Sequence, residues 1–210
     1  MSISSLISDE KKKFKIQKTS HSMKFAEFST YLSKLEATTK RLEMFDILSE
    51  AFSKIDSKEI AKAVYFVQEM LLPSFENVQL GVADRMVEKA ISVAFNQPLE
   101  KIKEENKNLG DLGLVAEKYN KNRTESKLSI LDVYNKLFDI AKISGEGSVD
   151  QKINEIADLL DKTTSIESKY IVRFMLGRLR LGVGEATIME ALSKAKTGDR
   201  NFKEKIERAF

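Results

Sequence analysis

Apolar residues recur at intervals of three and four along nearly the whole chain from Met23 onward, and this spacing is the strongest constraint on its fold. Only two prolines and nine glycines interrupt the 210 residues, and the good helix formers Lys, Glu, Leu and Ala are abundant. No stretch of useful length alternates between apolar and polar residues as a strand does. We therefore expect an all-α fold of roughly ten to twelve helices, packed as two helical lobes.

The apolar stripes and the capping residues together place the expected helices. The main stripes expected in the core are Phe25, Phe28, Leu32 and Leu35; Leu42, Phe45, Leu48, Phe52 and Ile55; Ile60, Val64, Val67 and Leu71; Met86, Val87, Ala90, Ile91 and Ala94; Tyr134, Leu137, Phe138 and Ala141; and Ile153, Ile156, Ala157 and Leu160. Helix starts are predicted at Thr38 or Thr39, an Asp56–Glu59 capping box, Pro98, Ser129, Ser148 and Ser165. Helix ends are predicted at Pro73 and at Gly145 and Gly147, and a last helix is expected from Asn201.

Residues 1–22 differ in composition from the rest of the chain, because Ser and Lys dominate them and Met23 resembles a natural start. We expect this leader to be vector-derived or a disordered basic arm, without a role in the fold. Residues 23–210 are expected to form the helical domain, with an internal lobe boundary in the polar segment 120–127. Since no stop signal precedes Phe210, we expect a fragment cut at a domain boundary.

The composition excludes several classes of active site. The sequence has no Cys, so it offers no disulfide framework, Cys-based zinc site or thiol nucleophile. Its single His21 lies in the polar leader, so Ser-His-Asp catalysis is not expected, and neither is a metal site. No apolar run approaches the roughly 18 residues of a membrane span, so we expect no membrane partner. The net charge is only +3, so any nucleic-acid surface must come from local clustering of basic residues.

The segment from Gly177 to Glu185 is the strongest candidate for such a cluster, because it places three glycines and two arginines at a turn between two helices. Glycine at Gly182 and Gly184 permits positive φ and close approach of another molecule to the backbone. The helix that begins near Glu185 presents unpaired N–H groups, which favour an anion. The local pattern alone also fits a helix C-cap with two solvated arginines, and it does not decide between these interpretations.

Four stretches stand out when they are taken in order along the chain: Thr38–Met44, Gly110–Glu117, Lys142–Ser148 and Val172–Glu185. Together they resemble the N-terminal DNA-binding domain of ATP-dependent DNA ligases of the archaeal and eukaryotic type. The resemblance covers about Met23 to Phe210. It implies an all-helical domain that binds duplex DNA across the minor groove on both sides of a nick, independently of sequence, and serves replication, repair and recombination.

The resemblance also implies particular contact residues. By their match to the family's motifs, the residues expected to grip the DNA backbone are Gly177, Arg178, Arg180, Gly182 and Gly184, with Thr39, Lys40 and Arg41 as a second contact. Such contacts recognise phosphates and groove shape rather than base edges.

The adenylation chemistry of the family is expected to lie elsewhere in the parent protein. A ligase takes AMP from ATP on a lysine in a Lys-x-Asp-Gly segment, and the 210 residues contain no such segment. We therefore expect no catalytic residue and no cofactor in this chain, which should be inactive alone, whereas the parent enzyme would use ATP and Mg²⁺. The expected partners are nicked duplex DNA and the catalytic domains of the same parent chain.

A sliding clamp is a further partner that the family resemblance suggests. Some archaeal relatives reach it through paired aromatic residues in the loop that matches 120–127, and this loop has none here, so a clamp contact through it is in doubt. We expect a monomer, in the cytoplasm or nucleoid of a prokaryotic or archaeal cell.

Two other functions remain open at this point. The first is a helical protein-interaction module without a nucleic-acid role, which predicts an exposed apolar groove. The second is a sequence-specific helix-turn-helix protein, which predicts contacts to base edges.

Overall fold

The computed structural model describes residues 22–71, 80–121 and 123–197, and these residues form helices without a β-strand. The ten helices described are α2 (Phe25–Glu36), α3 (Arg41–Lys54), α4 (Ile60–Val67), α5 (Asp84–Ala94), α6 (Leu99–Leu109), α7 (Leu112–Tyr119), α8 (Ile130–Lys142), α9 (Ser148–Asp161), α10 (Ser165–Met175) and α11 (Glu185–Thr197). The all-α prediction is therefore confirmed. The helix expected from Asn201, the stop at Pro73 and the leader up to residue 21 lie outside the described residues.

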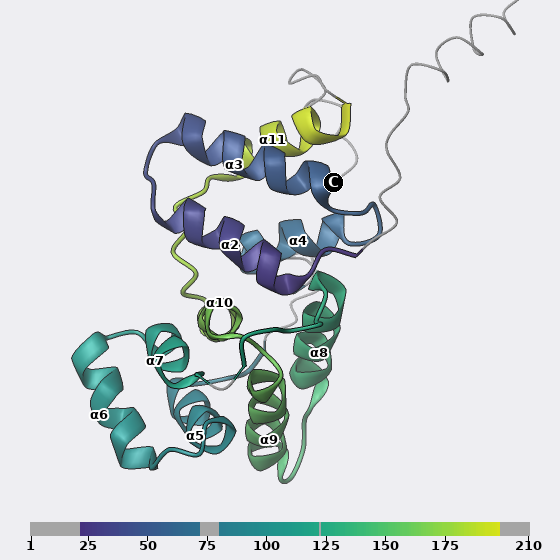
Figure 1. Ribbon diagram of the computed structural model, residues 1–210. Coiled ribbons are helices and arrows are strands. Elements are labelled where there is room, and N and C mark those ends of the chain that lie inside the picture. The colour runs from purple at the N-terminus through teal and green to yellow at the C-terminus, as the bar shows by residue number, and fades with distance from the viewer. Residues whose placement is uncertain (1–21, 72–79, 122, 198–210) are drawn as a thin grey trace, which may run out of the picture.

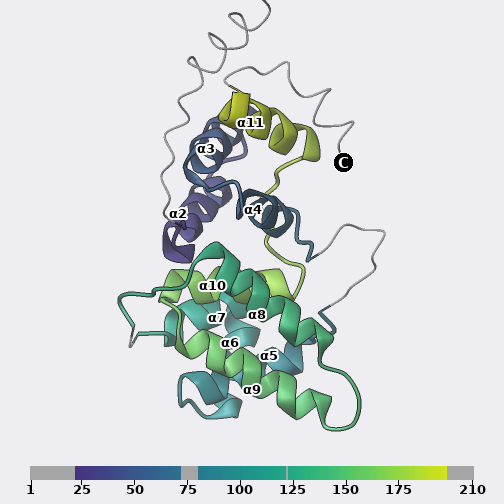
Figure 2. The same cartoon turned by 90° about the vertical axis from the view of Figure 1, so that its right-hand side faces the viewer.

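The helices lie in two groups. In Figure 1, α2, α3, α4 and α11 form the upper group, and α5 to α10 form the lower one. Figure 2 shows α10 lying across the top of the lower group, below α2 and α4. The most extensive packing joins α3 to α11, α7 to α10 and α5 to α9, and α10 also packs on α2. Helices before and after segment 120–127 thus pack together, as α7 with α10 and α5 with α9.

The predicted apolar stripes form the core, with one clear exception. Phe25, Phe66 and Phe174 come from three helices and meet at its centre, where the Phe66 and Phe174 rings stack with centroids 4.4 Å apart. Leu42, by contrast, is 70% exposed, so its assignment to the core is wrong. It lies in the first turn of α3, before the buried stripe of that helix begins at Met44.

The capping predictions are partly correct. Ser129 caps α8 in a capping box with Asp132, as its position indicated. The cap of α10 is Thr164, one residue before the predicted Ser165, because Thr164 forms the box with Glu167. Lys40 and Gly147 take the N-cap positions of α3 and α9, and neither supplies a side-chain cap.

The predicted Asp56–Glu59 capping box is wrong, because the side chain of Glu59 turns into the protein and is 3% exposed. Its carboxylate accepts hydrogen bonds from the N–H groups of Met23, at 3.0 Å, and Leu131, at 3.3 Å. It also accepts one from the hydroxyl of Ser22, the last residue of the expected leader. Glu59 therefore ties the start of the described chain to α8, because a buried carboxylate needs donors from several elements.

Candidate nucleic-acid interface

The turn between α10 and α11, residues 177–184, is built by an alternation of exposed and buried side chains. α10 ends at Met175, and Gly177, at φ +62°, lets the chain reverse so that the Arg178 N–H donates to the Arg173 carbonyl at 2.8 Å. Leu179 is fully buried, while Arg178 and Arg180 are exposed on either side of it. We call this segment the glycine-arginine corner.

The backbone of the corner differs in one respect from the prediction. Gly182 has a positive φ of +65°, but Gly184 does not; its carbonyl accepts the first hydrogen bonds of α11, from Thr187 and Ile188. The third positive φ of the corner falls instead on Arg180, at +53°. A non-glycine residue in this region is uncommon, and such conformations are often found at functional sites.

The two arginines have different electrostatic surroundings. Arg178 forms an ion pair with Asp84, the first residue of α5, at 3.1 Å, and both side chains are nearly half exposed. Arg180 has no acidic partner among the described residues. The carboxylate of Glu69 accepts a hydrogen bond from the Leu179 N–H, so that donor of the corner is already occupied. The N–H groups at the start of α11 are further donors for an anion.

The second predicted contact, Thr39 to Arg41, lies beside the corner. Its three residues are exposed at the start of α3, and Arg41 pairs with Glu190 of α11 at 2.8 Å. Lys40 pairs with Glu43 at 2.7 Å on the open surface. The packing of α3 on α11 thus brings both predicted contacts together. Because exposed ion pairs contribute only about 0–1 kcal/mol, a phosphate can replace these carboxylates.

A partly buried ionic cluster, which the sequence pattern did not predict, holds α2, α7 and α10 together. Its members are Glu36, Asp111, Lys169, Tyr170 and Arg173. The Arg173 guanidinium lies 2.9 Å from Glu36 and 2.8 Å from Asp111, and its side chain is only 7% exposed. The other carboxylate oxygen of Asp111 caps α7 by accepting hydrogen bonds from the N–H groups of Gly113 and Leu114. The spacing of Lys169 and Arg173, four residues apart, places both cations on one face of α10. Because residues 167–175 of this helix are buried, these cations need acidic partners within the protein.

This cluster changes the acidity of its carboxylates. Burial would raise the pKa of Glu36, but hydrogen bonds from Lys169, Tyr170 and Arg173 outweigh it and lower the pKa to about 2. The pKa of Asp111 is likewise lowered, because Arg173 and the N–H groups of α7 outweigh the effect of burial. Burial and the hydrogen bond to Glu36 raise the pKa of Tyr170.

The lowered pKa of Glu36 predicts an acid-sensitive contribution to stability. Its ordinary pKa is 4.5, so the contribution is complete above about pH 4.5 and is lost as the pH falls toward 2. We expect the free energy of unfolding of the Glu36→Gln variant to fall less steeply than that of the wild type over this range, as measured by urea unfolding. Glu27→Gln, which removes an exposed carboxylate of the same helix, is the matched control for the change in net charge. Parallel curves for the wild type and Glu36→Gln would contradict the assignment.

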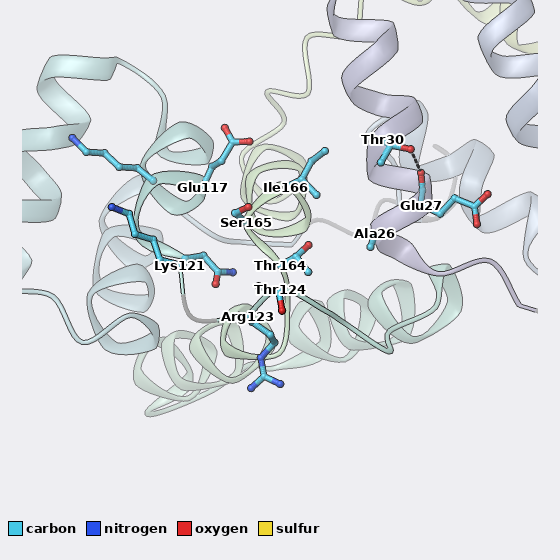
Figure 3. A pocket seen from close by; sticks show the side chains of 12 residues that line it. Ala26, Glu27, Thr30, Glu117, Lys121, Arg123, Thr124, Thr164, Ser165 and Ile166 are labelled. Atoms are coloured by element: carbon cyan, nitrogen blue, oxygen red, sulfur yellow. Dashed lines mark hydrogen bonds between the residues drawn. The ribbon is translucent and has the colours of Figure 1, made fainter.

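A separate cleft of about 900 Å³ lies between α2, the end of α7 and the start of α10 (Figure 3). It includes the segment in which a clamp contact was considered, and it carries both Lys121 and Arg123 and the acidic Glu27 and Glu117. Asn120 anchors the segment by donating to the Thr163 carbonyl at 2.8 Å. Since charges of both signs line this cleft, it has no clear preference for an anion.

The described residues show neither a metal-binding cluster nor a membrane-spanning helix. No group of three or more His, Asp or Glu side chains gathers there in a way that could hold a metal ion. Within the same ranges, none of the helices is both long and apolar enough to cross a lipid bilayer.

The fold and the corner define an all-helical domain with a cationic turn between its last two described helices. Residues 24–193 match the family described as DNA ligase N terminus. The chain belongs to this family.

Curated relatives agree with this family assignment. The chain is 44% identical over 188 residues to a probable DNA ligase of Dictyoglomus thermophilum, covering 90% of this chain and 32% of the relative. It is 42% identical over 201 residues to a DNA ligase of Sulfurisphaera tokodaii, covering 90% and 34%. It is 38% identical over 188 residues to DNA ligase 1 of Methanosarcina mazei, covering 90% and 32%. The chain therefore spans about a third of the length of these relatives.

Proposed function

We propose that this domain binds duplex DNA around nicks without sequence preference, through the minor groove and the phosphates, as the N-terminal part of an ATP-dependent DNA ligase of replication and repair. The observation that carries the proposal is the convergence of the glycine-arginine corner and the start of α3 on one surface. Arg180 provides a guanidinium without an acidic partner among the described residues, and Arg178, Lys40 and Arg41 form ion pairs at the surface that a phosphate could replace. Guanidinium groups and backbone N–H groups are the usual donors to DNA phosphates.

The proposal assigns adenylation to the rest of the parent chain. The 210 residues contain no Lys-x-Asp-Gly segment, so the lysine that would carry AMP is assigned to the rest of the parent chain, together with ATP and Mg²⁺. This domain therefore supplies binding and orientation of the DNA, and the catalytic domains of the same chain are its first partner.

The alternative of a protein-interaction module has less support. It requires an exposed apolar groove, whereas the most exposed large apolar residues in the described ranges lie on four different helices. They are Leu42, Val93, Leu109 and Val149. Single exposed apolar residues are common on protein surfaces and do not define an interface.

The corner is tested by the double variant Arg178→Ala/Arg180→Ala. We expect its affinity for nicked and intact duplexes to fall by the same factor for every duplex sequence. The slope of log affinity against log salt should flatten by about 1 for each arginine, because each substitution removes about one phosphate contact. The measurement is fluorescence anisotropy at several salt concentrations.

A charge-matched control, Lys58→Ala/Lys127→Ala, removes two exposed cations from other segments and should keep the wild-type slope. Equal affinity of the corner variant and this control would overturn the assignment of the corner. A strong preference for one duplex sequence would instead favour a helix-turn-helix protein.

A further inference from the structure

A groove of about 440 Å³ between α5 and α6 gathers positive charge that the corner does not use. Figure 1 shows these two helices in the lower group, next to α7. The groove is lined by Arg85, Glu88, Lys89, Leu99, Lys103, Asn106 and Lys107. Four of the seven residues are cationic and one is acidic, so the groove, which we call the α5–α6 groove, has a formal charge of +3.

The cations are spaced so that they repel one another. Arg85 and Lys89 lie four residues apart on α5, as do Lys103 and Lys107 on α6. Like charges at this spacing destabilise a helix by roughly 0.2–0.5 kcal/mol for each pair. Elsewhere on the surface the chain places opposite charges at the same spacing, as in the Lys54–Glu50 ion pair of α3. An anion in the groove would relieve the repulsion.

The protein itself neutralises little of this charge. The carboxylate of Glu88 accepts a hydrogen bond from the Asn106 amide at 2.9 Å. Lys103 pairs with Glu100, whose side chain is 83% exposed. Arg85, Lys89 and Lys107 have no acidic partner among the described residues. Three cations are thus available to one ligand.

The first turn of α5 contributes residues to both the groove and the corner. Asp84, the residue before Arg85, is the ion-pair partner of Arg178, so the first turn of α5 joins the two surfaces. We infer that the α5–α6 groove binds a phosphodiester backbone and extends the contact of the corner to further phosphates of the same duplex. This inference rests on the proposed function of the corner. An acidic protein segment would match the charge equally well, but the adjoining corner favours DNA.

The test is the triple variant Arg85→Gln/Lys89→Gln/Lys107→Gln, measured by anisotropy with duplexes of about one and about three helical turns, at about 10 bp for each turn. On the longer duplex we expect the salt slope to flatten by about 2–3, since each phosphate contact contributes about 0.9. The affinity at moderate salt should fall at least about tenfold. The loss should be smaller on the short duplex, which cannot fill both surfaces.

Two controls separate binding from folding and from total charge. Lys58→Gln/Lys127→Gln/Lys162→Gln removes three exposed cations from other segments and should keep the wild-type salt slope. The groove variant should unfold at the wild-type temperature or above it, because it removes like-charge repulsion and no buried contact.

The outcomes distinguish this inference from the proposed function. If the wild-type chain does not bind duplexes, the proposed function fails and the inference with it. A second outcome is that the wild type binds duplexes and the corner variant does not. If the groove variant then keeps the wild-type affinity and salt slope on the long duplex, the α5–α6 groove does not bind DNA. The proposed function of the corner stands in that case. A groove variant that loses binding to a polyglutamate peptide while keeping DNA affinity would overturn it in favour of an acidic protein partner.

Discussion

The Arg173→Leu variant is expected to unfold at a temperature lower than the wild type by roughly 10 °C, a loss of about 3–5 kcal/mol. Leucine fills much of the space but cannot neutralise the two carboxylates that Arg173 contacts, Asp111 at 2.8 Å and Glu36 at 2.9 Å. Removing one member of a buried ionic cluster costs far more than the pair contributes, because the remaining charges keep their desolvation penalty. Asp111 cannot turn away to solvent, since its other oxygen caps α7.

Arg123→Leu is the matched control, because Arg123 forms an exposed ion pair with Asp161 at 3.4 Å. Its loss should be less than about 1 kcal/mol. The double variant Arg173→Leu/Asp111→Asn should recover part of the stability lost in Arg173→Leu, since Asp111 is the carboxylate that loses its only cationic partner, whereas Glu36 keeps Lys169 at 2.9 Å. Equal melting temperatures for Arg173→Leu and Arg123→Leu would show that the cluster contributes no more than a surface pair.

The sequence was sufficient for those features that depend on near neighbours in the chain. Helical periodicity predicted the all-α fold, because the burial of Phe25, Phe28 and Leu32 follows from their spacing on one helix. The same reasoning placed Leu42 in the core, but the residue lies in the first turn of α3 and is exposed. Periodicity does not show where along a helix the packing begins.

Features that join distant parts of the chain could not be predicted in this way. Glu59 fits a local capping box, but donors from Met23 and Leu131 draw its carboxylate inward. Glu69 reaches the corner from 110 residues earlier in the chain. The cluster around Arg173 likewise depends on how α2, α7 and α10 meet, and only the tertiary structure reveals that arrangement.

In the candidate site, the feature that near neighbours in the sequence could predict was the turn between α10 and α11. The alternation of Arg178, Leu179 and Arg180 places the cations outward, as the structure has them. The pairing of Arg178 with Asp84 and of Arg41 with Glu190 joins separate helices, so the sequence pattern gave no sign of it. The role of these residues in DNA binding stays a prediction until the corner variants are measured.

Gly113→Ala is the second substitution expected to have a large effect, because Gly113 lies where α7 packs against α10. A Cβ atom at this position would come within 2.7 Å of Arg173 Cγ, 2.8 Å of the Lys169 carbonyl oxygen and 2.9 Å of Asp111 Oδ1. The carbonyl oxygen belongs to the backbone of α10 and can move only with the helix. We expect a loss of about 3 kcal/mol, measured by urea unfolding, as is typical when a methyl group overpacks a rigid contact.

Gly184→Ala is the matched control, since a Cβ atom there meets nothing within 4 Å and the residue has no positive φ. Its stability should stay within about 0.5 kcal/mol of the wild type or rise, because alanine restricts the unfolded chain. Equal stability of Gly113→Ala and Gly184→Ala would mean that α7 and α10 can move apart without a loss of free energy. The close packing at Gly113 would then not hold Arg173 in place. Because α10 ends in the glycine-arginine corner, a displacement of this helix by Gly113→Ala should also move Arg178 and Arg180 relative to Arg41 on α3. The packing of α7 on α10 at Gly113 therefore also sets the spacing of the proposed DNA contacts.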